Sequence, residues 1–388
     1  MKVITDTESL ASLCRAYAEA PYVTIDTEFM RERTYYAQLC LVQLARPGGG
    51  PDDAVIVDPL AEGLDLAPLY ELLSADVLKV FHAARQDVEI FYTQTGEVPH
   101  PLFDTQVAAM VCGYGDQVGY ETLVRRIAKA DLDKSSRFTD WSHRPLSEKQ
   151  LAYALADVTH LRAVYEKLSE RLESSGRASW VAEEMAVLTN PETYRVDPDE
   201  AWRRVKARSS SPRFLAVVRA LARWRELTAQ ARDVPRSRIL KDDALVEIAS
   251  ARPTTPDQLH KLRLLQREAR KPEMAAEILA AVAEGVACPE ERLPRLPDPP
   301  RRREGSAAVA DLLRVLLKAR ADRLGIAARL LASSADLDAL AGEEDPDLPL
   351  LKGWRFESFG RDALRLCEGE IGLGVGANGV EVIERSAG

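Results

Sequence analysis

The stretch Val23-Thr-Ile-Asp-Thr-Glu-Phe29 decides how the N-terminal half of the chain folds. Its β-branched residues predict a short strand, and successive side chains of a strand point to opposite faces. Asp26 and Glu28 therefore lie on one face, whereas Ile25 and Thr27 lie on the other. Taken alone, this pattern is most simply an ordinary strand with an acidic solvent face.

The sequence around this strand indicates a mixed α/β domain. Two more β-rich runs follow it, at 37–44 and 54–58, and the three together predict a meander. The next elements we expect are a helix near 66–74, a strand at 78–81, a helix that carries Asp87 and, after 104, mostly helices. A long helix should begin after Ser147, a residue type that commonly caps helices, and end near 172.

The composition is that of a globular protein with two or three domains. The chain has 388 residues, of which 46% are hydrophobic and 29% are charged. The N-terminus has acids where a signal peptide needs an apolar core, and no run is apolar enough to span a membrane, so we expect a cytoplasmic protein. The five cysteines are far apart and lack metal-ligand spacing, which indicates reduced packing residues.

The charge is unevenly distributed. A formal net charge of −9 argues by itself against a nucleic-acid partner. Residues 202–241, however, hold twelve Lys or Arg against two acids. Apolar residues recur there at helical spacing, so the segment is expected to form basic helices that bind nucleic acid, an acidic membrane or an acidic partner, or that simply face solvent.

The C-terminal half is predicted to be helical. Prolines divide residues 213–285 into helix-length pieces, as expected of a small bundle. Residues 289–305 contain five prolines and an arginine run, which indicates a linker. Residues 307–367 are again helical in pattern, and a Gly-rich tail follows with one expected strand at 379–383.

Two further motifs supply carboxylates. Asp87 lies in a helix that follows a buried strand, and Tyr153 and Asp157 are four residues apart, so they share one face of a helix. Each has an ordinary structural explanation when it is read alone. If the four acids converge, however, they need a cation, because clustered carboxylates in apolar surroundings are costly. Mg²⁺ and Mn²⁺ prefer oxygen ligands, so if the four acids converge the chain is most simply a metal-dependent nuclease.

In these motifs the chain resembles the DEDD superfamily of 3′–5′ exonucleases, in the subgroup with Tyr in the third motif, and within it the bacterial ribonuclease D family. The resemblance covers roughly residues 1–190 and rests on Asp26-Thr-Glu28, Tyr35 to Gln43, Phe81 to Asp87, Phe103-Asp-Thr-Gln106, Leu132 to Leu146 and Tyr153 to Asp157. It implies a ribonuclease H-like α/β fold, with a mixed sheet flanked by helices.

The resemblance also implies two divalent metal ions, Mg²⁺ or Mn²⁺, and a role for each acid. Asp26 would bridge both ions, Glu28 and Asp157 would complete the site of one, and Asp87 would support the other through water. Tyr153 would orient the attacking water. The product would be a nucleoside 5′-monophosphate.

A second resemblance lies in the basic segment. Residues 221–226, 234–239, 243–249 and 259–262 resemble the helicase and ribonuclease D C-terminal (HRDC) domain, which commonly binds nucleic acid non-specifically. Residues 307–367 look like a second, diverged and less basic copy. The expected parts are an exonuclease domain at 1–195, a basic HRDC domain at 205–288, a Pro/Arg-rich linker at 289–305 and an HRDC-like domain at 306–388, both helical parts being small all-α bundles.

Several residues are expected to contact RNA, because Arg can hold phosphate and Trp can stack on a base. They are Arg137, Trp141 and Arg144 before the Tyr153 helix, and Arg219, Arg223, Arg225, Arg236 and Arg238 in the basic segment. For Trp141 a structural role on a loop is nearly as well supported.

The sequence thus predicts a cytoplasmic 3′–5′ exoribonuclease that trims structured RNA 3′ ends, with tRNA precursors implied by the resemblance. No membrane and no obligate protein partner are expected. Two alternatives stay open: a DNA exonuclease of the same superfamily, and a non-catalytic RNA-binding adaptor. The presence of all four acids and Tyr153 argues against the adaptor, because a dead site has no metal to offset their repulsion.

Overall fold

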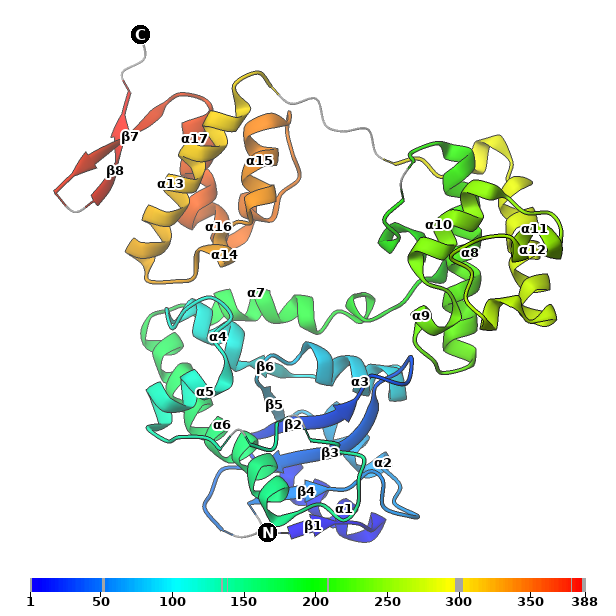
Figure 1. The fold of residues 1–388 in the computed structure, drawn as a ribbon. Helices are drawn as coiled ribbons and strands as arrows, with labels where there is room; N and C mark the ends of the chain where they lie inside the picture. The colour runs from blue at the N-terminus through cyan, green and yellow to red at the C-terminus, as the bar shows by residue number, and fades with distance from the viewer. Residues whose placement is uncertain are drawn as a thin grey trace.

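A six-stranded mixed sheet forms the centre of the N-terminal domain (Figure 1). The computed structural model describes residues 2–50, 53–133, 135–137, 139–207, 209–296, 303–377 and 379–385. In spatial order the strands are β1 (Lys2–Ile4), β4 (Ala54–Val57), β3 (Gln38–Ala45), β2 (Tyr22–Met30), β5 (Leu78–Phe81) and β6 (Leu102–Asp104). β3 is antiparallel to both neighbours and the other pairs are parallel. The expected meander is therefore confirmed as β2–β3–β4, whereas the short strands β1 and β6 were not expected.

The long helix that carries Tyr153 and Asp157 lies across this sheet. The helices of the domain are α1 (Thr7–Ala18), α2 (Ala67–Ser74), α3 (Arg85–Thr95), α4 (Thr105–Val111), α5 (Tyr120–Leu123), α6 (Glu148–Ser174) and α7 (Ala178–Leu188). Ser147 caps α6 and forms a capping box with Gln150, as its residue type predicts. α6 packs on β2, β3 and β4, and the buried Thr24 hydroxyl donates to the Val158 carbonyl at 2.9 Å. The helix is therefore fixed on the strand that carries Asp26.

The basic segment folds as a separate helical unit with its own hydrophobic core. Its helices are α8 (Pro212–Ala231), α9 (Arg236–Ile239), α10 (Asp242–Ala251), α11 (Pro256–His260) and α12 (Pro272–Val286). The core also includes Ala201 and Trp202 from the 3₁₀ turns at Pro198–Arg204. The unit therefore begins slightly before the predicted boundary at 205.

The last unit is helical but ends in a β-hairpin. Its elements are α13 (Ser306–Leu324), α14 (Ala328–Leu331), α15 (Ser334–Gly342), α16 (Gly353–Arg355), α17 (Arg361–Cys367), β7 (Ile371–Gly376) and β8 (Gly379–Glu384). The strand expected at 379–383 is β8. Its partner β7 was not predicted, because every second residue of it is a glycine. The unit packs on the exonuclease domain, where Trp354 stacks on Trp180 of α7 with centroids 4.3 Å apart.

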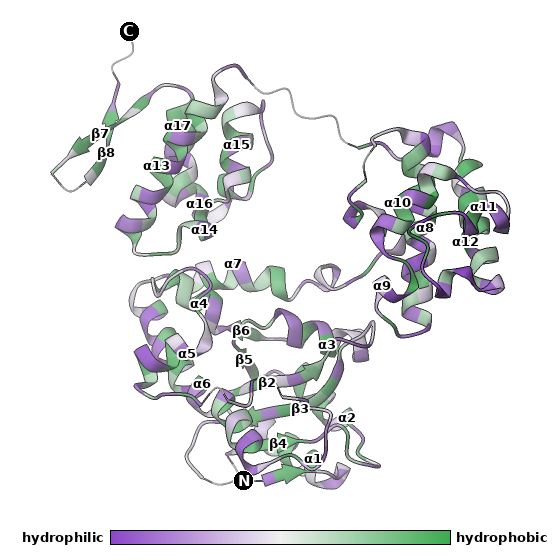
Figure 2. Cartoon of the chain, viewed as in Figure 1, coloured by the Kyte–Doolittle hydropathy of each residue, from purple (hydrophilic) through white to green (hydrophobic). Residues whose placement is uncertain are grey.

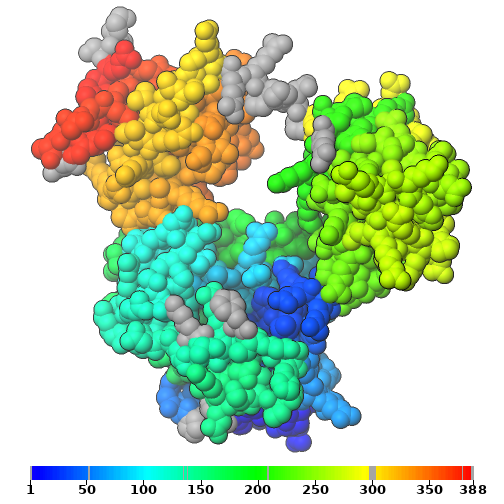
Figure 3. Space-filling model, viewed as in Figure 1, coloured from blue at the N-terminus to red at the C-terminus, as the bar shows by residue number. Residues whose placement is uncertain are grey.

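The two helical units lie on the same side of the exonuclease domain and leave open space between them (Figure 3). Their helices carry hydrophobic and hydrophilic residues in alternation along each helix (Figure 2), as expected of amphipathic helices that bury one face. Residues 297–302 of the predicted linker lie outside the described residues. In the part of the chain that the structure describes, no helix is long and apolar enough to cross a membrane. The five cysteines are free, as predicted.

Candidate active site

Three carboxylates from two elements meet beside the end of β2. Asp26 and Glu28 come from the strand and Asp157 comes from α6, and one oxygen from each lies within 4.8 Å of the others. A β-bulge follows directly between Glu28 and Phe29. Bulges next to a site change the direction of the strand and so help to aim side chains. The sequence predicted that these three residues form one site, and the structure brings them together.

The fourth acid lies beside this group and outside it. Asp87 is in the first turn of α3 and is only 6% exposed. Its carboxylate accepts a hydrogen bond from the hydroxyl of Thr27, the residue between the two strand acids. Among the described residues, the group within 4.8 Å comprises only Asp26, Glu28 and Asp157. Thr27, which the sequence did not single out, therefore links α3 to the strand that carries the other acids.

Asp104 holds the turn that leads into α3. Its side-chain oxygens accept hydrogen bonds from the backbone N–H groups of Ala83 and Ala84, both at 2.9 Å, and of Gln106 at 2.7 Å. Ala83 has a φ of 58°, a left-handed conformation that is uncommon for residues other than glycine. The Asp104 carboxylate offsets the cost of this turn, and Asp87 follows a few residues later. The motif around Asp104 was noticed in the sequence, but its acid was assigned no role.

Tyr153 lies one turn before Asp157 on α6, and the interaction with its side chain offsets part of the rise in the pKa of the Asp157 carboxyl. Burial, and then the charges of Asp157, Glu28 and Asp26, raise the pKa of Tyr153 well above its ordinary value. The phenol therefore stays protonated at neutral pH and acts as a hydrogen-bond donor. It can position a water molecule, but it is a poor general base.

The four carboxylates are buried close together, and their negative charges repel one another unless a cation is bound. Burial raises the pKa of Asp26, Glu28, Asp87 and Asp157, and repulsion from Asp26 adds to the effect at the other three. Such shifts mean that the ionised forms need compensation. A set of carboxylate oxygens is what Mg²⁺ or Mn²⁺ prefers, so the residues present fit a divalent metal site.

The acids open into a cavity of about 540 Å³. Its walls include Phe29 and Leu161, which are apolar, and the polar groups of Gln86 and His82. Arg137 also lines the cavity, and its positive charge offsets a small part of the rise in the pKa of Asp157 and of Tyr153. Arg137, which was predicted to bind an RNA phosphate, therefore lies beside the acids, in a pocket with both apolar and charged walls.

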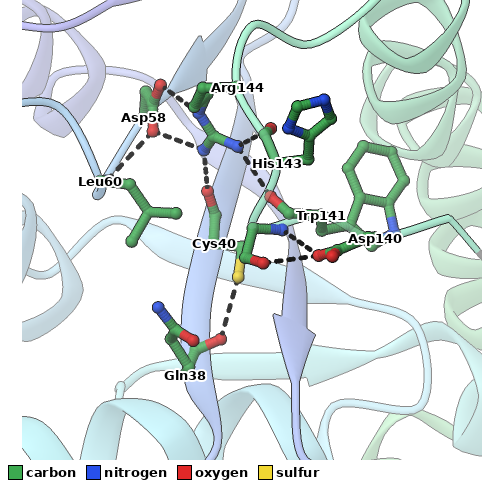
Figure 4. Close-up of polar contacts among 9 residues, drawn as sticks. Gln38, Cys40, Asp58, Leu60, Asp140, Trp141, His143 and Arg144 are labelled. Atoms are coloured by element: carbon green, nitrogen blue, oxygen red, sulfur yellow. Dashed lines mark hydrogen bonds and ion pairs between the residues drawn. The ribbon is translucent and has the colours of Figure 1, made fainter.

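Arg144 and Trp141, which the sequence analysis expected to contact RNA, make contacts within the protein. The Arg144 guanidinium donates to both oxygens of Asp58, at 2.8 and 2.6 Å, and to the Cys40 carbonyl at 2.8 Å (Figure 4). It thus fastens the loop before α6 to the sheet, and its donors are already used. Trp141 is only 3% exposed, and its ring lies 6.0 Å from that of Tyr153. It packs beside Tyr153 and is too buried to stack on a base.

The arginines of the basic unit that were predicted to bind RNA include some that make contacts within the protein and others that face solvent. Arg225 is 4% exposed and donates to the Leu240 carbonyl at 2.9 Å and to Asp242 at 2.6 Å, so it is a packing residue. Arg236 pairs with the buried Glu226, and Arg219 donates to the Arg292 carbonyl at 3.1 Å. Arg223 and Arg238 are exposed, and Arg223 forms an exposed ion pair with Asp199 at 2.9 Å. These two are the solvent-facing ones, because Arg225 is buried and Arg219 and Arg236 are half-buried. Helical periodicity alone does not show this difference in exposure.

Comparisons with known proteins agree with this architecture. The 3′–5′ exonuclease family matches residues 1–173 and the HRDC domain family matches residues 214–282. Ribonuclease D of Jannaschia sp. (strain CCS1) is 57% identical over 382 residues, which cover 98% of this chain and 99% of that protein. Ribonuclease D of Nitrobacter hamburgensis is 49% identical over 387 residues, with full coverage of both chains. The crystal structure of Escherichia coli RNase D matches with a TM-score of 0.82 and 32% identity, covering 95% of this chain and 98% of that one.

The fold and the site therefore define a 3′–5′ exonuclease with a C-terminal HRDC domain. The chain belongs to the ribonuclease D family of the DEDD superfamily, and it is a 3′–5′ exoribonuclease. Enzymes of this superfamily use divalent metals, and the cluster of Asp26, Glu28 and Asp157 is the candidate site for them here.

Proposed function

We propose that this enzyme hydrolyses RNA from its 3′ end at the site formed by Asp26, Glu28, Asp87 and Asp157, and that it releases nucleoside 5′-monophosphates. The observation that carries the proposal is the approach of three carboxylates to within 4.8 Å of one another. Two Mg²⁺ or Mn²⁺ ions held by the four acids would supply an acidified water and electrostatic stabilisation of the leaving oxygen.

The remaining groups of the site would position the reactants. Tyr153 keeps its proton because its pKa is raised, so its hydroxyl would hold the attacking water in place through a hydrogen bond. Arg137 lies on the cavity wall, where its guanidinium would pair with the phosphate next to the scissile bond. Apolar residues such as Phe29 would contact the terminal base or sugar.

The substrate that fits best is the 3′ end of a structured RNA, such as a tRNA precursor. The related E. coli protein is described as an exoribonuclease involved in structured RNA processing. The exposed Arg223 and Arg238 of the HRDC unit would hold the phosphate backbone without reading sequence. We place the enzyme in the cytoplasm, where such precursors and reduced cysteines are both expected.

An Asp26→Asn variant tests the site. It should lose metal-dependent hydrolysis of a 3′-labelled tRNA precursor while it keeps RNA binding, because the cation loses a shared ligand. Asp116→Asn, at an exposed position outside the cavity, is the matched control and should behave like the parent. If Asp26→Asn degrades the RNA as fast as the parent, the site is wrongly assigned.

A DNA exonuclease of the same superfamily would carry the same acids. Parallel incubation with RNA and DNA oligonucleotides of equal sequence, with and without EDTA, distinguishes the two. We expect faster metal-dependent release of mononucleotides from the RNA, and equal or faster digestion of the DNA would contradict the proposal.

A further inference from the structure

A second cavity, of about 940 Å³, lies where the exonuclease domain meets the basic helical unit. We call it the interdomain groove. It is lined by the β2–β3 loop at 31–37, by residues 89–96 of α3 and the turn after it, by residues 194–196, and by Gln230, Pro235 and Arg236 of the helical unit. α3 and α9 face each other at this place (Figure 1). None of the acids of the active site lines it.

Two walls of the groove begin at the catalytic acids. The β2–β3 loop leaves the strand three residues after Glu28, and α3 runs on from Asp87 toward Gly96. A helix rises 1.5 Å per residue, so this second wall extends roughly 14 Å from the active site, enough for a few nucleotides. A chain whose 3′ end lay among the acids could therefore continue directly into the groove.

The lining has the chemistry of a single-strand binding site. Four tyrosines (Tyr35, Tyr36, Tyr92, Tyr194) and three arginines (Arg31, Arg195, Arg236) line the groove. Tyr36 is 40% exposed, which leaves part of its ring open to solvent. Aromatic rings that stack on bases and arginines that pair with phosphates are the usual means of binding single-stranded nucleic acid without sequence preference.

Two of these arginines are held by weak, exposed ion pairs. Arg31 pairs with Glu89 at 2.5 Å and Arg195 pairs with Glu192 at 3.3 Å. Ion pairs between exposed side chains contribute little stability, because water and salt screen them. A phosphate can therefore replace either carboxylate at small cost, and more readily than it could displace the partners of a buried arginine.

The third arginine belongs to a partly buried contact that fixes the shape of the groove. The Tyr35 hydroxyl donates to Glu226 and accepts from Arg236 at 2.9 Å and from Gln230 at 3.0 Å. The backbone N–H groups of Tyr35 and of its neighbour Tyr36 both donate to Asp233 at 3.0 Å. The β2–β3 loop is thus tied to the helical unit, so the groove has a defined wall on both sides.

We propose that the interdomain groove binds the single-stranded RNA immediately upstream of the scissile bond, with Tyr36 stacking on a base and Arg195 pairing with a phosphate. This inference rests on the proposed function, because it assumes that the RNA 3′ end lies among the acids. It gives the short 3′ extension of a structured RNA a path between the active site and the helical unit.

The test compares RNAs of two lengths in a Tyr36→Ala/Arg195→Ala double variant. kcat/KM should fall about tenfold more on an oligoadenylate dodecanucleotide than on the trinucleotide, mostly through KM, because only the longer RNA reaches far into the groove. The slope of log KM against log salt concentration for the dodecanucleotide should also fall by about one, since one phosphate contact is lost. Arg329→Ala, an exposed arginine of the last unit outside the groove, is the control and should match the parent on both RNAs.

Equal losses on both RNAs, or an unchanged salt slope, would overturn the groove assignment. A failure of the proposed function looks different, because the parent enzyme itself would then show no metal-dependent hydrolysis of the trinucleotide. Both substituted side chains are exposed, so thermal unfolding of the variant should match that of the parent and show that the fold is kept.

Discussion

At the scale of single residues, the acids depend on neighbours that never reach the substrate. Asp104 is buried and accepts three backbone hydrogen bonds that shape the turn before Asp87. An Asp104→Asn variant puts an NH₂ group where one of these N–H donors points, so a bond is lost and two donors face each other. We expect a destabilisation of roughly 1–3 kcal/mol and a lower kcat, because Asp87 moves. Denaturant unfolding and single-turnover hydrolysis measure both effects.

The control for this variant is Asp65→Asn. Asp65 also accepts a backbone hydrogen bond, from Ala67 at 2.9 Å, but it is exposed and does not line the active-site cavity. It should cost little stability and leave kcat unchanged. If Asp104→Asn matches Asp65→Asn in kcat, the turn does not position Asp87.

The repulsion among the acids can also be measured directly. Burial and the charge of Asp26 raise the pKa of Asp157, so the stability that this group contributes is present at low pH and is lost as the pH rises through its raised pKa. An Asp157→Asn variant should therefore be more stable than the parent in EDTA, by about 1 kcal/mol, and this advantage should grow as the pH rises.

Calorimetry with and without Mn²⁺ should also show that the cation raises the melting temperature of the parent but not of the variant. A variant that is less stable than the parent in EDTA at every pH would contradict the account of the site.

At the scale of elements, the loop before α6 is fixed by one arginine. Arg144 forms a two-pronged pair with Asp58 and also bonds the Cys40 carbonyl (Figure 4). Lysine keeps the charge but cannot make the paired bonds, so Arg144→Lys should lose about 2 kcal/mol of stability. Because this loop supports Tyr153 through Trp141, kcat should fall as well.

The matched control is Arg46→Lys. Arg46 makes a single 2.9 Å bond to Asp53 at a more exposed site and lies over the Tyr17 ring, and lysine can keep both the ion pair and a positive charge near the ring. Unfolding in urea and initial rates on a short RNA would compare the two variants. Equal stability and equal rates would mean that Arg144 does not hold the loop.

The elements also show what the sequence could predict. The strand of Asp26, the helix of Asp157 and the cap at Ser147 were predicted because each depends on residues a few positions apart. Arg144 and Arg225 were expected to contact RNA, because nothing within a few residues of either one indicates that its donors are used inside the protein. Asp58 lies far before Arg144 in the chain, so only the folded sheet brings them together. Thr27 was missed for the same reason, since its partner is on another element.

At the scale of the whole molecule, the last helical unit and the exonuclease domain share one core. Trp354 stacks on Trp180 with an angle of 9° between the rings, Arg355 pairs with Glu184, and the Ala327 N–H donates to the Met110 carbonyl at 3.1 Å. Removal of all residues after 200 would expose this surface. The basic unit is different, because it has a core of its own.

A Trp354→Ala substitution tests this coupling without removing a domain. Trp354 is 7% exposed, and truncation of a buried Trp costs roughly 3–5 kcal/mol. We expect the exonuclease domain to unfold at a lower temperature together with the last unit, because the truncation leaves a cavity in the core that they share.

Trp224→Ala, in the basic unit, is the control. Trp224 is half-buried and donates to Glu277 at 2.8 Å, so its loss should leave the unfolding of the exonuclease domain unchanged. Limited proteolysis during heating would show which domain opens first, and an exonuclease domain that melts at the parent's temperature in Trp354→Ala would mean that the last unit contributes nothing to its stability.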